Sequence, residues 1–186
     1  MIYVALLRGI NVGGKNKINM KQLKQAFEQA GMTAVVTYIN SGNIIFASEL
    51  PQHKLSPLLE QKIHEIFSLD IPVMIRNLIE ITAVIEALPE DWTNDDGMKS
   101  DVLFLWNEID DPSIIDKLPL KPNMGIVHYI PGAVLLSIPR KNAAQSGMNK
   151  LVGSKLYRYM TIRNVNTTRE IYRLMYSTSE AISSME

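Results

Sequence analysis

The stretch from Gly9 to Asn16 has the residue types, and nearly the spacing, of a phosphate-binding loop. Its letters GINVGGKN follow the pattern G-x-x-x-x-G-K-[ST] up to the last position, between an expected strand and an expected helix. Asn16 replaces the serine or threonine that holds magnesium, and the expected helix begins too late for its N-terminus to cradle a phosphate. These departures argue against nucleotide hydrolysis.

A simpler hypothesis is that the same loop binds an anion without metal chemistry. Glycine-rich backbone presents N–H groups, and Arg8, Lys15 and Lys17 add positive charge. The alternative is that the glycines, Gly13 and Gly14 among them, only supply the positive φ angles of a turn.

A second polar segment, Asn40–Asn43, is typical of a hairpin turn between two β-rich stretches. In a sheet built as β-α-β-β-α-β, the first two strands run in the same direction and end at the same edge. The glycine-rich loop and this turn are then neighbours. The alternative for Asn40–Asn43 is a tight turn with no further role. The sequence therefore predicts a polar rim that consists of Arg8, Asn11, Lys15, Ser41 and Asn43.

The C-terminal part of the chain is basic. Residues 121–175 hold nine Lys and Arg residues and one acid, whereas residues 51–120 hold fourteen acids and five bases. Such a segment either binds a polyanion or neutralises the acidic half of the chain. We name as a candidate basic patch Arg140, Lys141, Lys150, Lys155 and Arg158.

Two arginines end predicted strands at the edge opposite the rim. Arg76 closes the last strand of the first half, and Arg163 that of the second half. A planar guanidinium suits a carboxylate or phosphate, so Arg163 is a candidate ligand-binding residue; the alternative is an ion pair between the halves.

Hydrophobic periodicity predicts the same order of elements twice. The first half contains strands at 2–7, 34–39, 44–47 and 71–75, and helices that start at an Asn19 N-cap, at 55 and at 78. The second half contains strands at 102–106, 126–130, 133–138 and 156–162, and helices at 112–118, 142–152 and 168–182; Thr167 and Glu170 form a predicted capping box for the last helix.

Short sequence matches support a repeat. Ile75–Asn77 is identical to Ile162–Asn164, and Thr37–Ile39 resembles His128–Ile130 at a similar offset. The sequence thus predicts an α+β fold of two ferredoxin-like lobes, each β-α-β-β-α-β plus a helix, over residues 1–90 and 91–186.

Several kinds of site are excluded. The chain has no cysteine, its three histidines lack zinc-like spacing, and no nucleophile elbow is present. We predict no metal and no cofactor, and because the acids are too scattered to name an acid–base pair, the catalytic residues, if the protein is an enzyme, stay unknown. No apolar run is long enough to cross a bilayer, and we expect a cytoplasmic protein without a membrane partner.

Three motifs of this chain resemble a bacterial family, domain of unknown function 1697. They are ALLRGINVGGKN at 5–16, TYINSGN at 37–43, and TIRN at 161–164 with Thr167. The resemblance implies two ferredoxin-like halves and no established activity. Val165 stands where an aromatic residue is expected. The polar positions that the resemblance indicates are Arg8, Asn11, Gly13, Gly14, Ser41, Gly42, Asn43, Arg163 and Asn164.

Three functions stay open from the sequence. The leading hypothesis is a binding protein for a nucleic acid or a phosphorylated small molecule. The second is an enzyme that acts on a small anionic metabolite in a cleft between the lobes, and the third is a module that binds a protein partner. The sequence does not indicate an oligomeric state.

Overall fold

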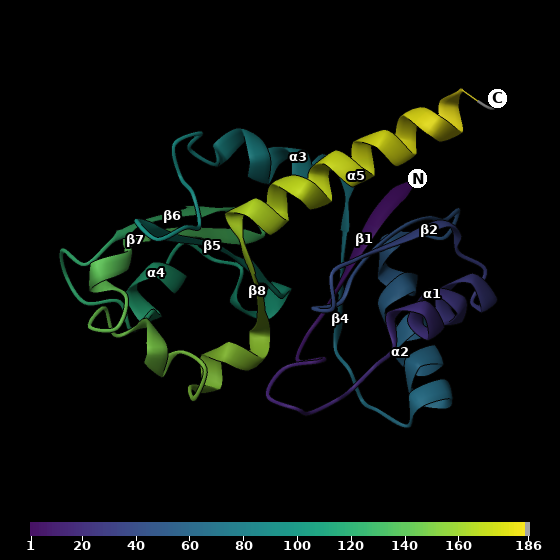
Figure 1. Cartoon of the computed structure of the whole chain (residues 1–186), viewed down its shortest axis with the longest axis horizontal. Coiled ribbons are helices and arrows are strands. Elements are labelled where there is room, and N and C mark those ends of the chain that lie inside the picture. Colours follow the sequence, from purple (N-terminus) through teal and green to yellow (C-terminus); the bar gives the residue numbers. More distant parts are fainter. Residues whose placement is uncertain (185–186) are drawn as a thin grey trace. The chain divides into compact units, whose positions relative to one another are not determined.

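The chain folds into two four-stranded antiparallel sheets with helices, which confirms the α+β class. The computed structural model describes residues 1–184 (Figure 1). It divides into two compact units, Met1–Ile81 with the segment from Ile171, and Thr82–Glu170. The unit boundaries fall inside two helices and not in the polar stretch 89–100, where the sequence predicts a single boundary. Folding of residues 1–90 and 91–186 as separate lobes stays a prediction.

The first unit is built around a central, fully buried strand. Its elements are β1 (Ile2–Leu7), α1 (Met20–Gln29), β2 (Thr33–Tyr38), β3 (Asn43–Ala47), α2 (Gln52–Phe67), β4 (Val73–Asn77) and the start of α3 (Leu78–Ala87). The sheet order is β2-β3-β1-β4, so β1 has a partner on each side. All six of its residues are buried, so both of its faces are covered, which explains its unbroken apolar sequence. Because β1 and β2 both run antiparallel to β3, they point the same way, as predicted.

Helices α1 and α2 share one core with one face of this sheet. The predicted N-cap of α1 is confirmed: Asn19 Oδ1 accepts hydrogen bonds from the backbone N–H groups of Lys21 and Gln22, at 3.0 and 3.1 Å. The helix buries Leu23 and Phe27 against the sheet. The ring of Phe27 meets that of Phe46 edge-on, 5.6 Å between centroids.

The second unit has the same strand order, β6-β7-β5-β8. Its elements are the rest of α3, β5 (Met98–Leu105), α4 (Ile114–Lys117), β6 (Ile126–Ile130), β7 (Ala133–Pro139), β8 (Met160–Asn164) and the start of α5 (Val165–Ser183). Four short 3₁₀ turns complete it: η1 (Asn107–Ile109), η2 (Arg140–Asn142), η3 (Met148–Lys150) and η4 (Lys155–Tyr159). In the described part of the chain, no α-helix connects β7 to β8.

Two predictions for residues 140–162 are therefore wrong. The helix expected at 142–152 is interrupted by Gly147, whose φ of 91° is incompatible with a right-handed helix. The strand expected at 156–162 begins only at Met160, which pairs with Leu105, the last residue of β5. Residues before Met160 have no partner strand, so their alternating pattern forms a 3₁₀ turn instead.

The predicted start of α5 is also corrected. The helix begins at Val165, and Asn164 Oδ1 accepts a hydrogen bond from the Thr167 backbone N–H at 2.8 Å. Asn77 has the same place before α3, where its Oδ1 accepts from the backbone N–H of Glu80 at 2.9 Å. The repeated Ile-Arg-Asn therefore marks a junction at which a strand passes directly into a helix.

No helix among the described residues is long and apolar enough to cross a membrane. Within residues 1–184, no three or more acidic or histidine side chains are grouped so that they could hold a metal ion.

Candidate functional site

The glycine-rich loop and the first hairpin turn meet at the common edge where β1 and β2 end. The backbone N–H of Leu7 donates to the Gly42 carbonyl at 2.8 Å, and Asn11 Nδ2 donates to the Asn40 carbonyl at 2.8 Å. The predicted proximity of these two segments is therefore confirmed. It follows from strand direction alone, because parallel strands of one sheet end at one edge.

The loop folds into a small hairpin of its own. Lys15 N–H donates to the Val12 carbonyl and Asn11 N–H to the Asn16 carbonyl, both at 3.1 Å. Gly13 and Gly14 form the tip, with φ of 59° and 75°, and a Cβ at either position would meet no atom within 4 Å. These glycines are required by backbone conformation. The open tip exposes their N–H-bearing backbone and Lys15 to solvent.

Asn11, a predicted ligand-binding residue, joins the loop to its neighbours. Its Nδ2 donates to the carbonyls of Ile18 and Asn40, at 3.1 and 2.8 Å, and its Oδ1 accepts from the Ile18 N–H at 2.9 Å. Its φ of 52° is a conformation that asparagine tolerates better than most residues. We assign to Asn11 the role of positioning the loop against the turn.

Asn43 and Ser41 lie within the turn. Asn43 is completely buried, and its Nδ2 donates to the Tyr38 carbonyl and to Ser41 Oγ, both at 3.1 Å. Burial keeps the Asn43 amide away from any ligand in solvent. The sequence pattern identified a polar rim, but it could not show that this side chain points into the protein.

A solvent-open hollow of about 640 Å³ lies beside the loop, at the start of α1. Lys17 is its only charged lining residue, and α1 carries no acid in its first turn. No acid lines the hollow, and the segment between Arg8 and Glu28 that supplies most of its lining contains none, so this segment is cationic. The lining residues are Asn11, Gly14, Lys17, Ile18, Asn19, Met20, Gln22 and Asn40.

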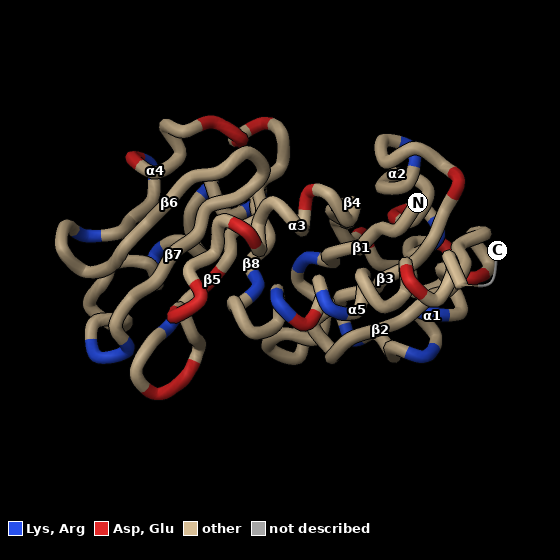
Figure 2. Tube along the Cα trace, turned by 90° about the horizontal axis from the view of Figure 1, so that it is seen from above, with Lys and Arg blue, Asp and Glu red and all other residues tan. Residues whose placement is uncertain are grey.

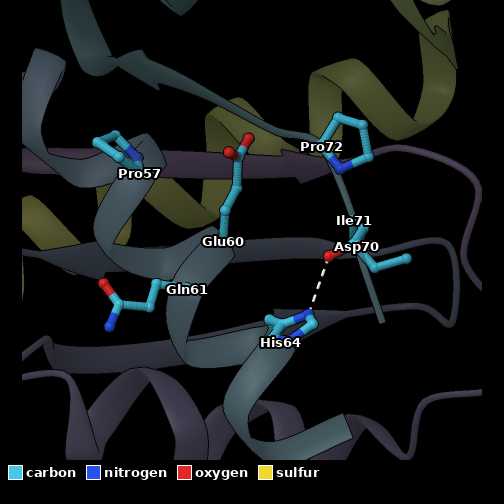
Figure 3. A pocket seen from close by; sticks show the side chains of 7 residues that line it. All are labelled: Pro57, Glu60, Gln61, His64, Asp70, Ile71 and Pro72. Atoms are coloured by element: carbon cyan, nitrogen blue, oxygen red, sulfur yellow. Dashed lines mark hydrogen bonds and ion pairs between the residues drawn. The ribbon is translucent and has the colours of Figure 1, made fainter. Parts of the chain in front are cut away.

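A second hollow of about 660 Å³, between α2 and the start of β4, has the opposite charge (Figure 3). His64 Nδ1 lies 2.9 Å from Asp70 Oδ1, and Glu60 Oε1 accepts from the Val73 N–H at 2.9 Å. The Pro72 carbonyl, which belongs to this hollow, accepts the Arg8 N–H at 3.1 Å. Two carboxylates make this hollow unsuitable for an anion.

The candidate arginines lie away from the rim edge of their sheets. Arg76 pairs with Val4 near the start of β1, which confirms its predicted place at the opposite edge. Arg163 lies in the second unit and is buried; its Nη1 donates to Thr161 Oγ1 and the Ile162 carbonyl, at 3.0 and 2.9 Å. Burial lowers the pKa of Arg163 to about 10, so the guanidinium stays charged at neutral pH. The Asn164 side chain caps α5.

The residues of the candidate basic patch have different environments. Arg140 is bound to the loop before β5, with Nε 2.9 Å from the Asp95 carbonyl and Nη2 3.0 Å from Asn94 Oδ1. Arg158 lies over the Tyr159 ring, 4.6 Å from its centroid. Lys141, Lys150 and Lys155 are exposed. Figure 2 shows Lys and Arg at several separate points along the second unit, so a continuous patch stays a prediction.

Comparison with known proteins identifies the family. The model of the family described as "Protein of unknown function (DUF1697)" matches residues 1–134. The chain belongs to the DUF1697 family. The matched part of this DUF1697 protein includes the glycine-rich loop and the first hairpin turn, whereas the TIRN motif lies beyond it.

One solved structure resembles the DUF1697 chain over nearly its whole length. It is the conserved bacterial protein SP0830 from Streptococcus pneumoniae, 29% identical, with a TM-score of 0.81. The similarity covers 94% of this chain and 98% of that one. No curated protein matches the chain.

Proposed function

We propose that this DUF1697 protein binds a phosphate-bearing ligand, a nucleic acid or a phosphorylated small molecule, in the hollow beside the glycine-rich loop. The observation that carries the proposal is the acid-free, cationic surrounding of this hollow. In water, positive charge around a concave surface raises the local concentration of anions.

The groups that would contact the ligand differ from those that position them. Lys15 and Lys17 are exposed and would supply charge to phosphate oxygens. Asn19 and Gln22 line the hollow at the start of α1, where the helix dipole also favours negative charge. Asn11 and Asn43 would hold the loop and the turn in place.

We also interpret the two units as ferredoxin-like lobes. Both sheets have the order that this topology requires, with the first strand between the third and the fourth. In the first unit, two helices pack on one face of the sheet. In the second unit the second helix is replaced by 3₁₀ turns, which is a departure from the pattern.

Removing the two exposed lysines should weaken binding. We expect Lys15→Gln/Lys17→Gln to bind a fluorescently labelled single-stranded RNA roughly tenfold more weakly, because each lysine loses a charged contact. The slope of log K against log salt should become smaller by about 1.4, the value for two lost phosphate contacts on a single strand. Fluorescence anisotropy at several salt concentrations measures both.

The matched control is Lys54→Gln/Lys62→Gln, which removes the same charge from α2. This control should bind like the wild type. Equal loss in both double variants would show a non-specific effect of charge and contradict the proposed site. Competition by ATP or inorganic pyrophosphate would indicate a small phosphorylated ligand, whereas displacement by unlabelled RNA alone would indicate a nucleic acid. Absence of binding to all of these at low salt would overturn the proposal.

A further inference from the structure

The second unit contains a half-enclosed pocket of about 270 Å³, roughly the bulk volume of nine waters. It lies between one face of the sheet and the irregular segment 143–152. Leu103, Leu136 and Ile162 line it from β5, β7 and β8, and Leu151 and Val152 line it from the segment. Its wall is thus mainly apolar, as small-molecule sites usually are.

The pocket exists because the connection from β7 to β8 is not a helix. Gly147 holds this connection in place, since a Cβ there would lie 2.1 Å from the Pro119 carbonyl oxygen. The Ser146 carbonyl accepts a hydrogen bond from the Lys121 backbone N–H at 2.8 Å. This bond is a second contact between the connection and the segment that contains Pro119 and Lys121. A packed helix at this position would instead fill the space with side chains.

Two charged residues also line the pocket, Asp101 and Lys99. Asp101 precedes Leu103 by two residues and lies on the same face of β5 by the alternation of the strand, and its side chain is only 14% exposed. Its Oδ2 lies 3.4 Å from Lys99 Nζ, and the Lys99 side chain is 42% exposed. The Lys99 ammonium can therefore leave the ion pair with Asp101 and be hydrated in solvent instead.

Burial raises the pKa of Asp101, and the positive charges of Lys99 and Arg140 offset this effect only in part. The ionised carboxylate is thus incompletely solvated where it lines the pocket. A cation that enters the pocket would supply the missing compensation.

We propose that this pocket binds a small apolar molecule that carries one amine. The ammonium group would contact the Asp101 carboxylate, and the apolar body would lie against Leu103, Leu136 and Leu151. An anionic ligand is disfavoured, because its charge would face the Asp101 carboxylate, which is more deeply buried than the Lys99 ammonium that also lines the pocket (14% against 42% exposed). This site is distinct from the cationic hollow of the first unit in residues and in charge.

The buried carboxylate has a consequence for stability. Because the pKa of Asp101 in the folded protein lies above its ordinary value of 3.8, folding is penalised at pH values above the raised pKa, and the penalty disappears below 3.8. Asp101→Asn should therefore raise the Tm by about 2–4 °C at pH 7.5. The gain should shrink as the pH approaches 4. A gain that is the same at both pH values would contradict this account.

The binding test uses three probes of the same size with different charge: 2-phenylethylamine, 2-phenylethanol and phenylacetate. Chemical-shift changes in the amide spectrum of the ¹⁵N-labelled full chain give the Kd of each probe. We expect the amine to bind most tightly and phenylacetate most weakly, with the largest changes at Leu103, Leu151 and Val152. Asp101→Asn should weaken amine binding roughly tenfold and leave 2-phenylethanol unchanged.

Two further variants make the test specific. Asp116→Asn removes an exposed carboxylate of α4 that does not line the pocket, and it should leave amine binding unchanged. Ala143→Leu should fill the pocket and weaken both the amine and the alcohol. The proposal is wrong if the amine does not bind, if amine and alcohol bind equally, or if Asp101→Asn has no effect on the amine.

Discussion

A Gly42→Ala variant is expected to lose about 3 kcal/mol of its free energy of unfolding. Gly42 has a φ of 82°, and an added Cβ would lie 2.7 Å from Leu7 Cβ and 2.9 Å from Ile10 Cδ1. Left-handed backbone costs a residue with a Cβ roughly 1–2 kcal/mol, and overpacking a buried position adds about 1–3 kcal/mol. Both costs arise where β1 meets the hairpin turn.

Urea denaturation followed by circular dichroism measures this loss. Gly13→Ala is the matched control. Gly13 also has a positive φ, 59°, but a Cβ added there would meet no atom within 4 Å. The control should lose only about 1 kcal/mol, the cost of the backbone conformation alone. If the two variants were equally destabilised, close packing between the turn and Leu7 would not be the cause.

An Asn11→Ala variant is expected to lose a similar amount, about 3 kcal/mol. The substitution removes the hydrogen bonds of Asn11 to both backbone groups of Ile18 and to the Asn40 carbonyl. Each such bond contributes about 1 kcal/mol, and a backbone group left without a partner adds a desolvation cost. The φ of 52° becomes less favourable as well.

The control variant Asn16→Ala separates the cost of the backbone conformation from the cost of the lost hydrogen bonds. Asn16 has a similar φ, 47°, and its Nδ2 makes one hydrogen bond, to the Gly9 carbonyl at 2.9 Å. This variant should lose roughly half as much as Asn11→Ala. Thermal unfolding of both proteins at one pH gives the comparison. Equal losses in the free energy of unfolding would mean that the hydrogen bonds to Ile18 and Asn40 contribute nothing measurable.

Both variants act on the junction between the glycine-rich loop and the hairpin turn, which also borders the proposed phosphate-binding hollow. The exposed lysines of this region can be changed without touching the junction, because neither Lys15 nor Lys17 forms the ties that Asn11 makes. Stability and ligand binding are therefore separable by mutation. That separation keeps the proposed function testable in folded protein.

The sequence alone determined the order of the elements of the first unit and the meeting of its two polar segments, although β4 lies two residues later than the predicted strand 71–75. Hydrophobic periodicity depends on which face of an element is buried, and the direction of β1 and β2 decides which of their ends are neighbours. Both properties are local or topological. They could therefore be inferred before any coordinates, as could the N-cap at Asn19.

Only the tertiary structure decided what the polar side chains do. Asn11 and Asn40 are 29 residues apart in sequence, and Asn43 points into the protein and not toward solvent. Residue type does not reveal this, because the same amide can bind backbone or ligand. The irregular connection before β8 likewise depends on where β5 ends, since a strand needs a partner for its hydrogen bonds. The pocket beside Asp101 is a product of that long-range constraint, which no local pattern records.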